Sequence, residues 1–268
     1  MNNRISALAA IVLAAATLAA QPALAQGFAA VVTPPRFEIA AQAGERVRHV
    51  IEITNAAPAA ATYHVRTADW TLSPDASVSF QDELATDSCR PWVAIERREI
   101  SVPAGGQYRY RFEVQPPAGT ADRECRFAIM IEGDEQTVKT AAGLDVPVSG
   151  RIAVIVYLAV GAAAPDLAIV GSSVSTANGP AQPVLRIRNA GNAHGRLAGF
   201  LSGTDARGRR LEFSPATLPI LPGETRDIPL SATDGTAEIT DIAYPVTIKG
   251  VLELGVGRRV DIDIPFAR

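Results

Sequence analysis

Two arginines stand where their side chains could capture a carboxylate. Arg36 directly follows two prolines in a short apolar stretch, 31–39, and Arg151 follows a glycine at the start of a longer apolar run. An arginine presents a fork of N–H donors that can bind both oxygens of one carboxylate. The chemistry that this pair suggests is therefore capture of an acidic group. The alternative for either residue alone is an ordinary surface arginine.

The residues that carry catalysis in enzymes are scarce in this chain. It has only three histidines, His49, His64 and His194, and they are far apart in the sequence with no ligand-type spacing. The chain has no zinc-protease motif, nucleophile elbow, phosphate-binding loop or dinucleotide fingerprint. We therefore predict that the protein is not an enzyme and needs no metal or other cofactor. A site assembled from distant residues is the alternative.

The N-terminus indicates export. Residues 1–25 have the three parts of a secretory signal peptide: a basic start at Arg4, an apolar run over 5–20, and a small-x-small cleavage site at Ala23–Ala25. The alternative is an uncleaved anchor, but the run is shorter than the roughly 20 residues that span a bilayer. We predict that the mature chain begins at Gln26, that it works in the periplasm, and that it has no membrane insertion.

Export makes a disulfide possible between the two cysteines of the chain, Cys89 and Cys125. Their spacing is nothing like the Cys-x-x-Cys of redox enzymes, so a structural bridge is favoured over a redox role. The alternative is two buried free thiols.

Composition limits the architecture and the partners. The chain has 268 residues, of which 47% are hydrophobic, and a formal net charge of −3. This length suggests two domains. The small negative charge gives no electrostatic reason to expect a nucleic acid or an anionic membrane as a partner.

Strand-type alternation of apolar and polar residues dominates the chain after residue 25. Turn residues separate the runs at short intervals, which is typical of β-sandwich domains. The clearest runs are Val47–Ile53, Tyr108–Val114, Phe127–Ile131, Leu185–Ile187, Val246–Ile248 and Val260–Ile264.

A weak internal repeat supports two similar domains. An alternating run ends in Asn55 in the first half and in Asn189 in the second, and a Pro/Gly turn follows later in each, at 102–106 and at 221–224. The alternative is that strand–turn–strand patterns recur by chance in all-β chains. We place the domains at 26–161 and 162–268, because a small-residue break follows the most apolar run of the mature chain.

One segment suggests a function. Leu144, Val146 and Val148 alternate with polar residues, and Pro147 has no N–H to donate, so we expect an edge strand with one apolar face. Such an edge is a template for a strand of another chain. The alternative, weighed as equal, is a hairpin whose side chains fill the domain's own core.

These features together resemble the periplasmic pilus-assembly chaperones of the P-pilus type, as a divergent member. The resemblance covers roughly residues 28–160. It rests on Arg36 in Pro-Pro-Arg-Phe-Glu, on the run that ends in Asn55, on 101–112, and on the segment from Leu144 through Arg151 to Tyr157. It departs from the family after Tyr157, where Leu-Ala-Val-Gly replaces the usual Arg-Pro.

The resemblance implies two immunoglobulin-like β-sandwiches in a boomerang arrangement. Carried over, Leu144, Val146 and Val148 are the donor residues that complete a pilus or fibre subunit lacking its final strand, and Arg36 and Arg151 bind that subunit's terminal carboxylate. An outer-membrane usher is left open as a second partner. The rival hypothesis is an exported two-domain module for adhesion or structural binding, in which residues 144–148 are covered by the chain itself.

Overall fold

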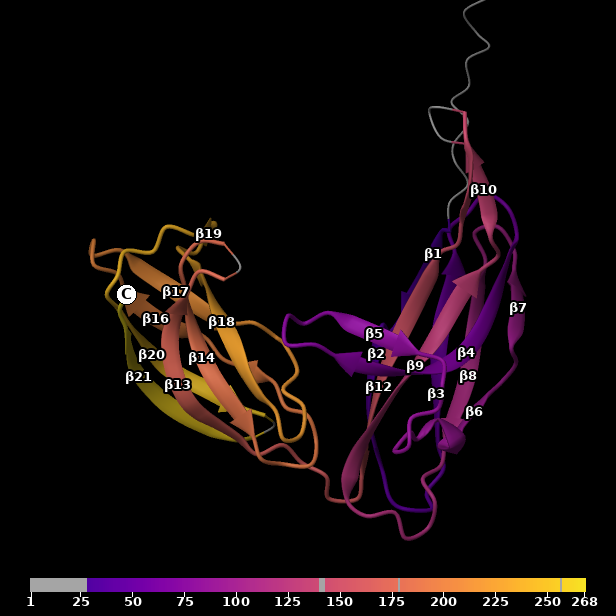
Figure 1. The fold of residues 1–268 in the computed structure, drawn as a ribbon, viewed down its shortest axis with the longest axis horizontal. Helices are drawn as coiled ribbons and strands as arrows, with labels where there is room; N and C mark the ends of the chain where they lie inside the picture. The colour runs from indigo at the N-terminus through magenta and orange to yellow at the C-terminus, as the bar shows by residue number, and fades with distance from the viewer. Residues whose placement is uncertain (1–27, 140–142, 178, 256) are drawn as a thin grey trace, which may run out of the picture.

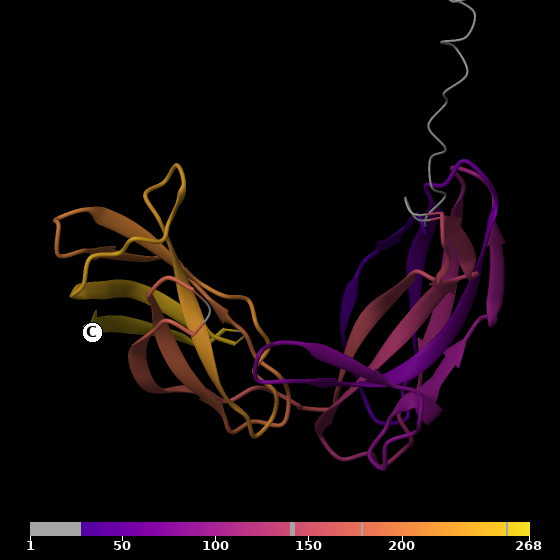
Figure 2. The same cartoon turned by 45° about the horizontal axis from the view of Figure 1, so that its top comes forward.

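The computed structural model describes residues 28–139, 143–177, 179–255 and 257–268. The signal peptide predicted at 1–25 lies outside these residues. Within them, no helix has the length and the hydrophobicity needed to cross a membrane. The structure is almost entirely β, and it forms two lobes that meet at one end and diverge at the other (Figures 1 and 2). The all-β class with two sandwiches in a bent arrangement, predicted from the sequence, is confirmed.

The described strands fall into two groups, and no strand of one group pairs with a strand of the other. The first lobe contains β1 (Ala30–Thr33), β2 (Arg36–Ala41), β3 (Val47–Asn55), β4 (Ala61–Leu72), β5 (Val78–Gln81), the 3-10 helix η2 (Arg90–Trp92), β6 (Val93–Ile95), β7 (Glu99–Val102), β8 (Gln107–Val114), β9 (Arg123–Gly133), β10 (Gln136–Lys139), β11 (Asp145–Val148) and β12 (Arg151–Val160). The second lobe contains β13 (Leu167–Ser175), β14 (Gln182–Asn189), β15 (Leu197–Ala198), β16 (Leu201–Thr204), β17 (Arg210–Pro215), β18 (Thr225–Thr233), β19 (Glu238–Ile239), β20 (Val246–Leu254) and β21 (Arg259–Phe266). The exact domain boundaries stay a prediction.

Two sheets form the first lobe. One has the order β1-β3-β8-β6, and the other has the order β2-β12-β9-β4-β5 with β7 paired to β4. Alternate residues of facing strands fill the space between them, so that side chains such as Ile51, Phe112, Phe127 and Val156 are fully buried or nearly so. This is the strand-period burial that the alternating runs predict. In the second lobe a single path of strands, β13-β14-β18-β17-β16-β20-β15, curves around a core of its own.

The N-terminal stretch that holds Arg36 crosses between the two sheets. β1 pairs antiparallel with β3 in the first sheet, whereas β2 pairs parallel with β12 in the second. Pro34 and Pro35 stand at the crossing, where their missing N–H groups cost no ladder hydrogen bond. Arg36 is therefore the first residue of an edge strand.

Two buried asparagines explain the internal repeat. Asn55 ends β3 and Asn189 ends β14, and both are fully buried. Each side-chain amide donates to the carbonyl four residues ahead and to a carbonyl of a facing segment, and accepts an N–H from two residues ahead. Asn55 donates to the carbonyls of Ala59 and Val102 and accepts the N–H of Ala57, at 2.8–3.1 Å. Asn189 donates to the carbonyls of Ala193 and Ile220 and accepts the N–H of Gly191, at 2.8–2.9 Å. The shared residue type thus reflects the same local structure in both lobes.

We expect Asn55→Ala and Asn189→Ala each to lower the free energy of unfolding of its lobe by about 2–3 kcal/mol, because buried carbonyls lose their donor. Urea denaturation measures the effect, with the exposed Gln81→Ala as the control. Wild-type unfolding midpoints for both variants would contradict this account of the repeat.

The cysteines form the bridge that the sequence favours. Cys89 and Cys125 are joined by a disulfide across a sequence separation of 36, with their Cα atoms 6.0 Å apart. Cys89 directly precedes η2 and Cys125 lies near the start of β9, so the bridge fastens the long 82–92 connection to the central sheet. Both are buried in the core of the first lobe.

Candidate functional site

Four strands make one long hairpin in the first lobe. β9 pairs antiparallel with β12, and their extensions β10 and β11 pair antiparallel with each other. A hydrogen bond from Gly133 N to Gly150 O, 3.0 Å long, links the two strand pairs. The β10–β11 end of this hairpin projects from the end of the lobe that is opposite the junction with the second lobe (Figure 1).

The even-numbered residues of β12 form a row whose side chains face the core. Leu144, Val146 and Val148, the donor residues predicted from the sequence, continue this row. Val154 and Val156 in this row are fully buried. Beyond the end of the sandwich, no second sheet formed by the described residues covers the row, and Leu144, Val146 and Val148 are 65%, 39% and 47% exposed. The even spacing of these positions is what keeps them on one face. The chain therefore displays three side chains of core type outside its own core.

The connection before this segment corrects one detail of the sequence analysis. Residues 133–142 read as a polar connection, but Gln136–Lys139 form β10 and pair in register with Asp145–Val148. β11 belongs to a hairpin, as one alternative for this segment requires, yet its apolar side chains stay exposed, as the other requires.

One edge of the hairpin is open over much of its length. β2 covers the edge of β12 only from Ile155 onward, where Ile155 is the partner of Arg36. Among the residues that the structure describes, no strand pairs with this edge between Val146 and Val154. The open edge therefore ends at the first residue of β2, which is Arg36.

The two arginines lie on the same face of the sheet but at different points along it. Arg36 is opposite Ile155, and Arg151 precedes Ile155 by four residues, so both side chains project from the outer face of the sheet. Four residue positions correspond to roughly 13 Å along a strand. Arg36 lies at the end of the open edge, whereas Arg151 lies beside its middle, opposite Glu132 of β9. The structure does not bring the two together at one point.

Phe28 fills a gap in the core-facing row. Position 150 of this row is a glycine, and the Phe28 ring occupies the space where a side chain at Gly150 or at the neighbouring Gly133 would project. The ring also meets Tyr63 edge-on, with centroids 5.9 Å apart. The sequence alone does not predict this role of Phe28. Its signal is the pair of glycines, Gly133 and Gly150, which become neighbours only in the folded sheet.

Glu38 connects Arg36 with the second lobe. Its Oε1 lies 3.1 Å from Arg36 Nε, 3.5 Å from Arg196 Nε and 3.6 Å from His194 Nε2. The Arg36 and Glu38 side chains are both about half exposed, at 50% and 51%. Because solvent screens such an exposed pair, the internal contact holds Arg36 only weakly.

A buried carboxylate and an imidazole hold the lobes together. Glu124 lies in β9, and its Oε2 is 2.5 Å from His194 Nδ1 and accepts the His194 backbone N–H at 2.9 Å. The two side chains are only 2% and 9% exposed. The His194 ring stacks on Tyr157 of β12 with centroids 3.8 Å apart, and burial raises the pKa of Tyr157. Arg196 lies over the same Tyr157 ring.

Further contacts reinforce this junction. The backbone carbonyl of Asn192 accepts the Glu124 N–H, and the Asn192 side-chain amide donates to the Asp122 carbonyl. The Arg226 guanidinium of the second lobe donates to the carbonyls of Ser73 and Pro74. Because these contacts come from several elements of both lobes, we infer that the angle between the lobes is fixed. The junction is not visible in the sequence, because Glu124 and His194 are 70 residues apart.

We expect His194→Ala to loosen the junction, because it removes the ring from Tyr157 and leaves the buried Glu124 carboxylate without its main partner. The radius of gyration in small-angle X-ray scattering should rise, and the distribution of interatomic distances should broaden. The matched control is His64→Ala, at a half-exposed histidine of the first lobe. An unchanged scattering profile for His194→Ala would show that the other contacts suffice to fix the angle.

The sequence matches no family model and no curated protein. Among solved structures, the chain is similar to the Escherichia coli chaperone DraB, with 15% identity, a TM-score of 0.45, and coverage of 88% of this chain and 97% of that one. The Pseudomonas aeruginosa CupB2 chaperone has 12% identity, a TM-score of 0.44, and coverage of 88% and 100%. The Salmonella enterica SafB chaperone, solved with the SafA pilin, has 12% identity, a TM-score of 0.47, and coverage of 88% and 97%.

All three of these structures are described as chaperones, and one contains a pilin. At these identities and scores, the function of this chain has to be inferred from its own hairpin, its open edge and its arginines.

Proposed function

We propose that the protein is a periplasmic chaperone that lends the β11 segment to a fibre subunit lacking its final strand. The observation that carries the proposal is the exposed row of Leu144, Val146 and Val148, which continues the core row of β12 past the end of its own sandwich. A client with an open apolar groove would bury this row. No bond is made or broken in such a process, so it requires no catalytic group.

Two kinds of contact would hold the client. Its own strand would pair with the open backbone edge between Val146 and Val154, which supplies affinity independent of sequence. The apolar row would enter the client's groove, and full burial of each side chain is worth roughly 1.5–3 kcal/mol. The gain at Val146 and Val148 is smaller than this range, because each is already more than half covered in the free chain.

The position of Arg36 favours one direction for the client strand. A strand that runs parallel to β11 and β12 along the open edge reaches β2 with its C-terminal end. Its terminal carboxylate would then lie at Arg36, where the guanidinium fork can bind both oxygens. Arg151 would contact the middle of the same strand, because it lies roughly 13 Å before that point. The two arginines would thus serve different parts of one client.

We expect Arg36→Ala to weaken client binding without unfolding the chaperone. The loss of a charge-assisted hydrogen bond costs about 1.5–3 kcal/mol, which is about ten- to a hundred-fold in Kd. The measurement uses a tagged chain to isolate the partner from periplasm, followed by titration with synthetic peptides of the partner's C-terminal strand, ending in a carboxylate or in an amide.

Arg36→Ala should reduce affinity for the acid peptide and leave affinity for the amide peptide unchanged. The control is Arg109→Ala, at an exposed arginine of the other sheet. Equal losses for both peptides, or no loss for either, would remove the carboxylate role from Arg36.

A further inference from the structure

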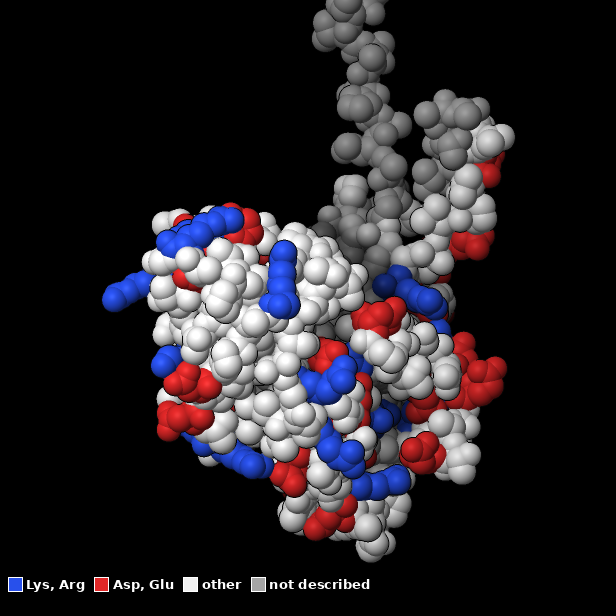
Figure 3. Space-filling view, turned by 60° about the vertical axis from the view of Figure 1, so that its left-hand side comes forward, with Lys and Arg blue, Asp and Glu red and all other residues white. Residues whose placement is uncertain are grey.

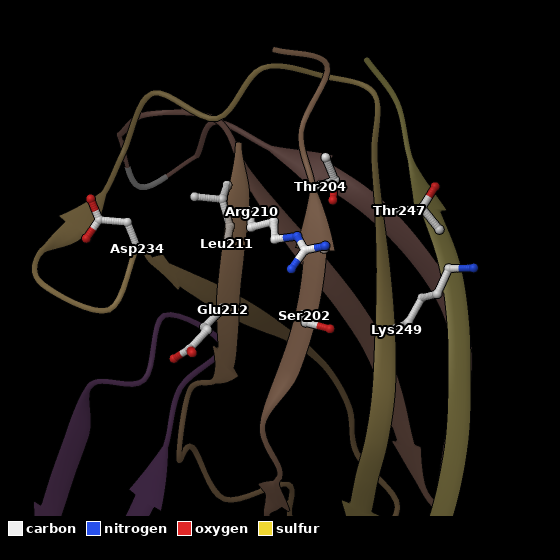
Figure 4. A pocket seen from close by; sticks show the side chains of 9 residues that line it. Ser202, Thr204, Arg210, Leu211, Glu212, Asp234, Thr247 and Lys249 are labelled. Carbon is white, nitrogen blue, oxygen red and sulfur yellow. The ribbon is translucent and has the colours of Figure 1, made fainter. Parts of the chain in front are cut away.

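The second lobe contains a broad hollow on one face of its sheet. It has a volume of about 700 Å³ and lies on the outer face of β16, β17 and β20 (Figure 4). Ser202 and Thr204 of β16 lie in its middle, with Arg210 and Glu212 of β17 on one side and Thr247 and Lys249 of β20 on the other. The strand-donation proposal makes no use of this surface.

The charges around the hollow balance. Arg210 and Lys249 are opposed by Glu212 and Asp234. Asp234 stays ionised at neutral pH, because hydrogen bonds from Thr236 and Ala237 hold its pKa at about 2. On the face of the molecule shown in Figure 3, basic and acidic side chains are also interspersed. A surface without a dominant sign is unsuited to a polyanion or to a cation.

Two of the charged groups are available to a ligand. Lys249 pairs with Asp263 at 2.8 Å, but within the described residues neither Arg210 nor Glu212 makes an ion pair or a side-chain hydrogen bond. Figure 4 shows the Arg210 guanidinium lying over β16 on the side of Thr204. The hollow therefore offers N–H donors, carboxylate acceptors and hydroxyl groups that act as both.

An aromatic side chain extends the same face. Phe200 is 90% exposed and stands two positions from Ser202, which is about 7 Å along a strand. Its neighbour across the sheet is Val251, itself 45% exposed, because Leu201 pairs with Gly250. The exposed side chains of Phe200 and Val251 together form a small apolar surface beside the hollow.

Two glycines shape the backbone next to Phe200. Gly199 and Gly250 have φ angles of +140° and +142°, which other residues rarely adopt. A side chain at Gly199 would lie 2.6 Å from Val251 O, and one at Gly250 would lie 3.0 Å from Phe200 O. The backbone around Phe200 thus depends on glycine on both sides.

We propose that this surface, formed by the hollow and Phe200, binds a neutral oligosaccharide. Sugar hydroxyls match the mixed donors and acceptors of Arg210, Glu212 and the Ser/Thr side chains. The apolar face of a sugar ring can stack on the Phe200 ring, which stands two positions from Ser202 on the same side of the sheet. The balanced charge fits a ligand that has none. The site is independent of the strand that the first lobe would donate.

The test titrates the full mature chain by calorimetry with three neutral oligosaccharides: chitohexaose, cellohexaose and maltohexaose. We expect saturable binding of at least one, with Phe200→Ala and Glu212→Gln each lowering affinity about tenfold or more. Phe200→Trp should retain binding, and Val170→Ala, at an exposed valine of the same lobe, should not alter it.

Absence of saturable binding by all three sugars at millimolar concentrations would overturn the proposal. Binding that Phe200→Ala and Glu212→Gln leave unchanged would also overturn it, because the sugar would then lie elsewhere. A chain that binds no sugar but loses its protein partner on Phe200→Ala would assign this surface to a protein contact instead.

Discussion

Val146→Asp is expected to abolish client binding while the chaperone stays folded. Val146 is at the centre of the exposed row, in a two-stranded hairpin outside the core, so the free chain can keep the new carboxylate in water. In the complex, the same carboxylate would have to enter an apolar groove without a partner, which costs several kcal/mol. Affinity should fall by about a thousandfold or more.

The measurement is the yield of the co-purified partner per chaperone, together with the Kd of the isolated pair. The matched control is Thr137→Asp. Thr137 is the partner of Pro147, so its side chain lies on the opposite face of the same hairpin. An equal loss for both variants would indicate a general effect of charge, and an unchanged yield for Val146→Asp would exclude the row as the donor.

Removal of the disulfide has the second large effect. The bridge closes a separation of 36 residues, which corresponds to about 3–4 kcal/mol in the chain-entropy model. The double variant Cys89→Ala/Cys125→Ala should lower the free energy of unfolding of the first lobe by this amount. Urea denaturation with and without a thiol reductant measures it.

The reductant serves as the internal control for this expectation. It should destabilise the wild-type chain and have no effect on the double variant. We also expect small-angle X-ray scattering to give a broader distribution of interatomic distances for the double variant, because Cys125 is adjacent to Glu124 at the junction between the lobes. Equal unfolding midpoints for the reduced and oxidised wild-type chain would contradict a stabilising role of the bridge.

Local patterns in the sequence predicted most of the strands. The runs Val47–Ile53, Tyr108–Val114 and Phe127–Ile131 all lie within observed strands, because alternation follows directly from burial of one face of a sheet. The repeated asparagines were visible for a similar reason. Each fills one structural role that needs an amide at the end of a strand, so the residue type recurs with the structure.

The sequence did not predict features that depend on pairing between distant segments. β10 is polar and short, and it exists because Asp145–Val148 pairs with it. The separation of Arg36 from Arg151 follows from the register of β2 against β12, which packing of the whole sheet sets. Glu124 and His194 meet only when both lobes have formed. In each case the relevant distance is determined by tertiary structure.

The central claim is that the open edge between Val146 and Val154 holds a strand of a client. Site-specific photo-crosslinking tests it most directly, with a photoreactive amino acid in place of Ser149, beside the apolar row, or in place of Val170 on the second lobe. After irradiation in the periplasm, mass spectrometry locates the linked peptides. The account predicts that position 149 links to the C-terminal strand of a small exported β protein and that position 170 does not. Links from position 149 to no partner, or to segments outside the final strands of its partner, would contradict strand donation.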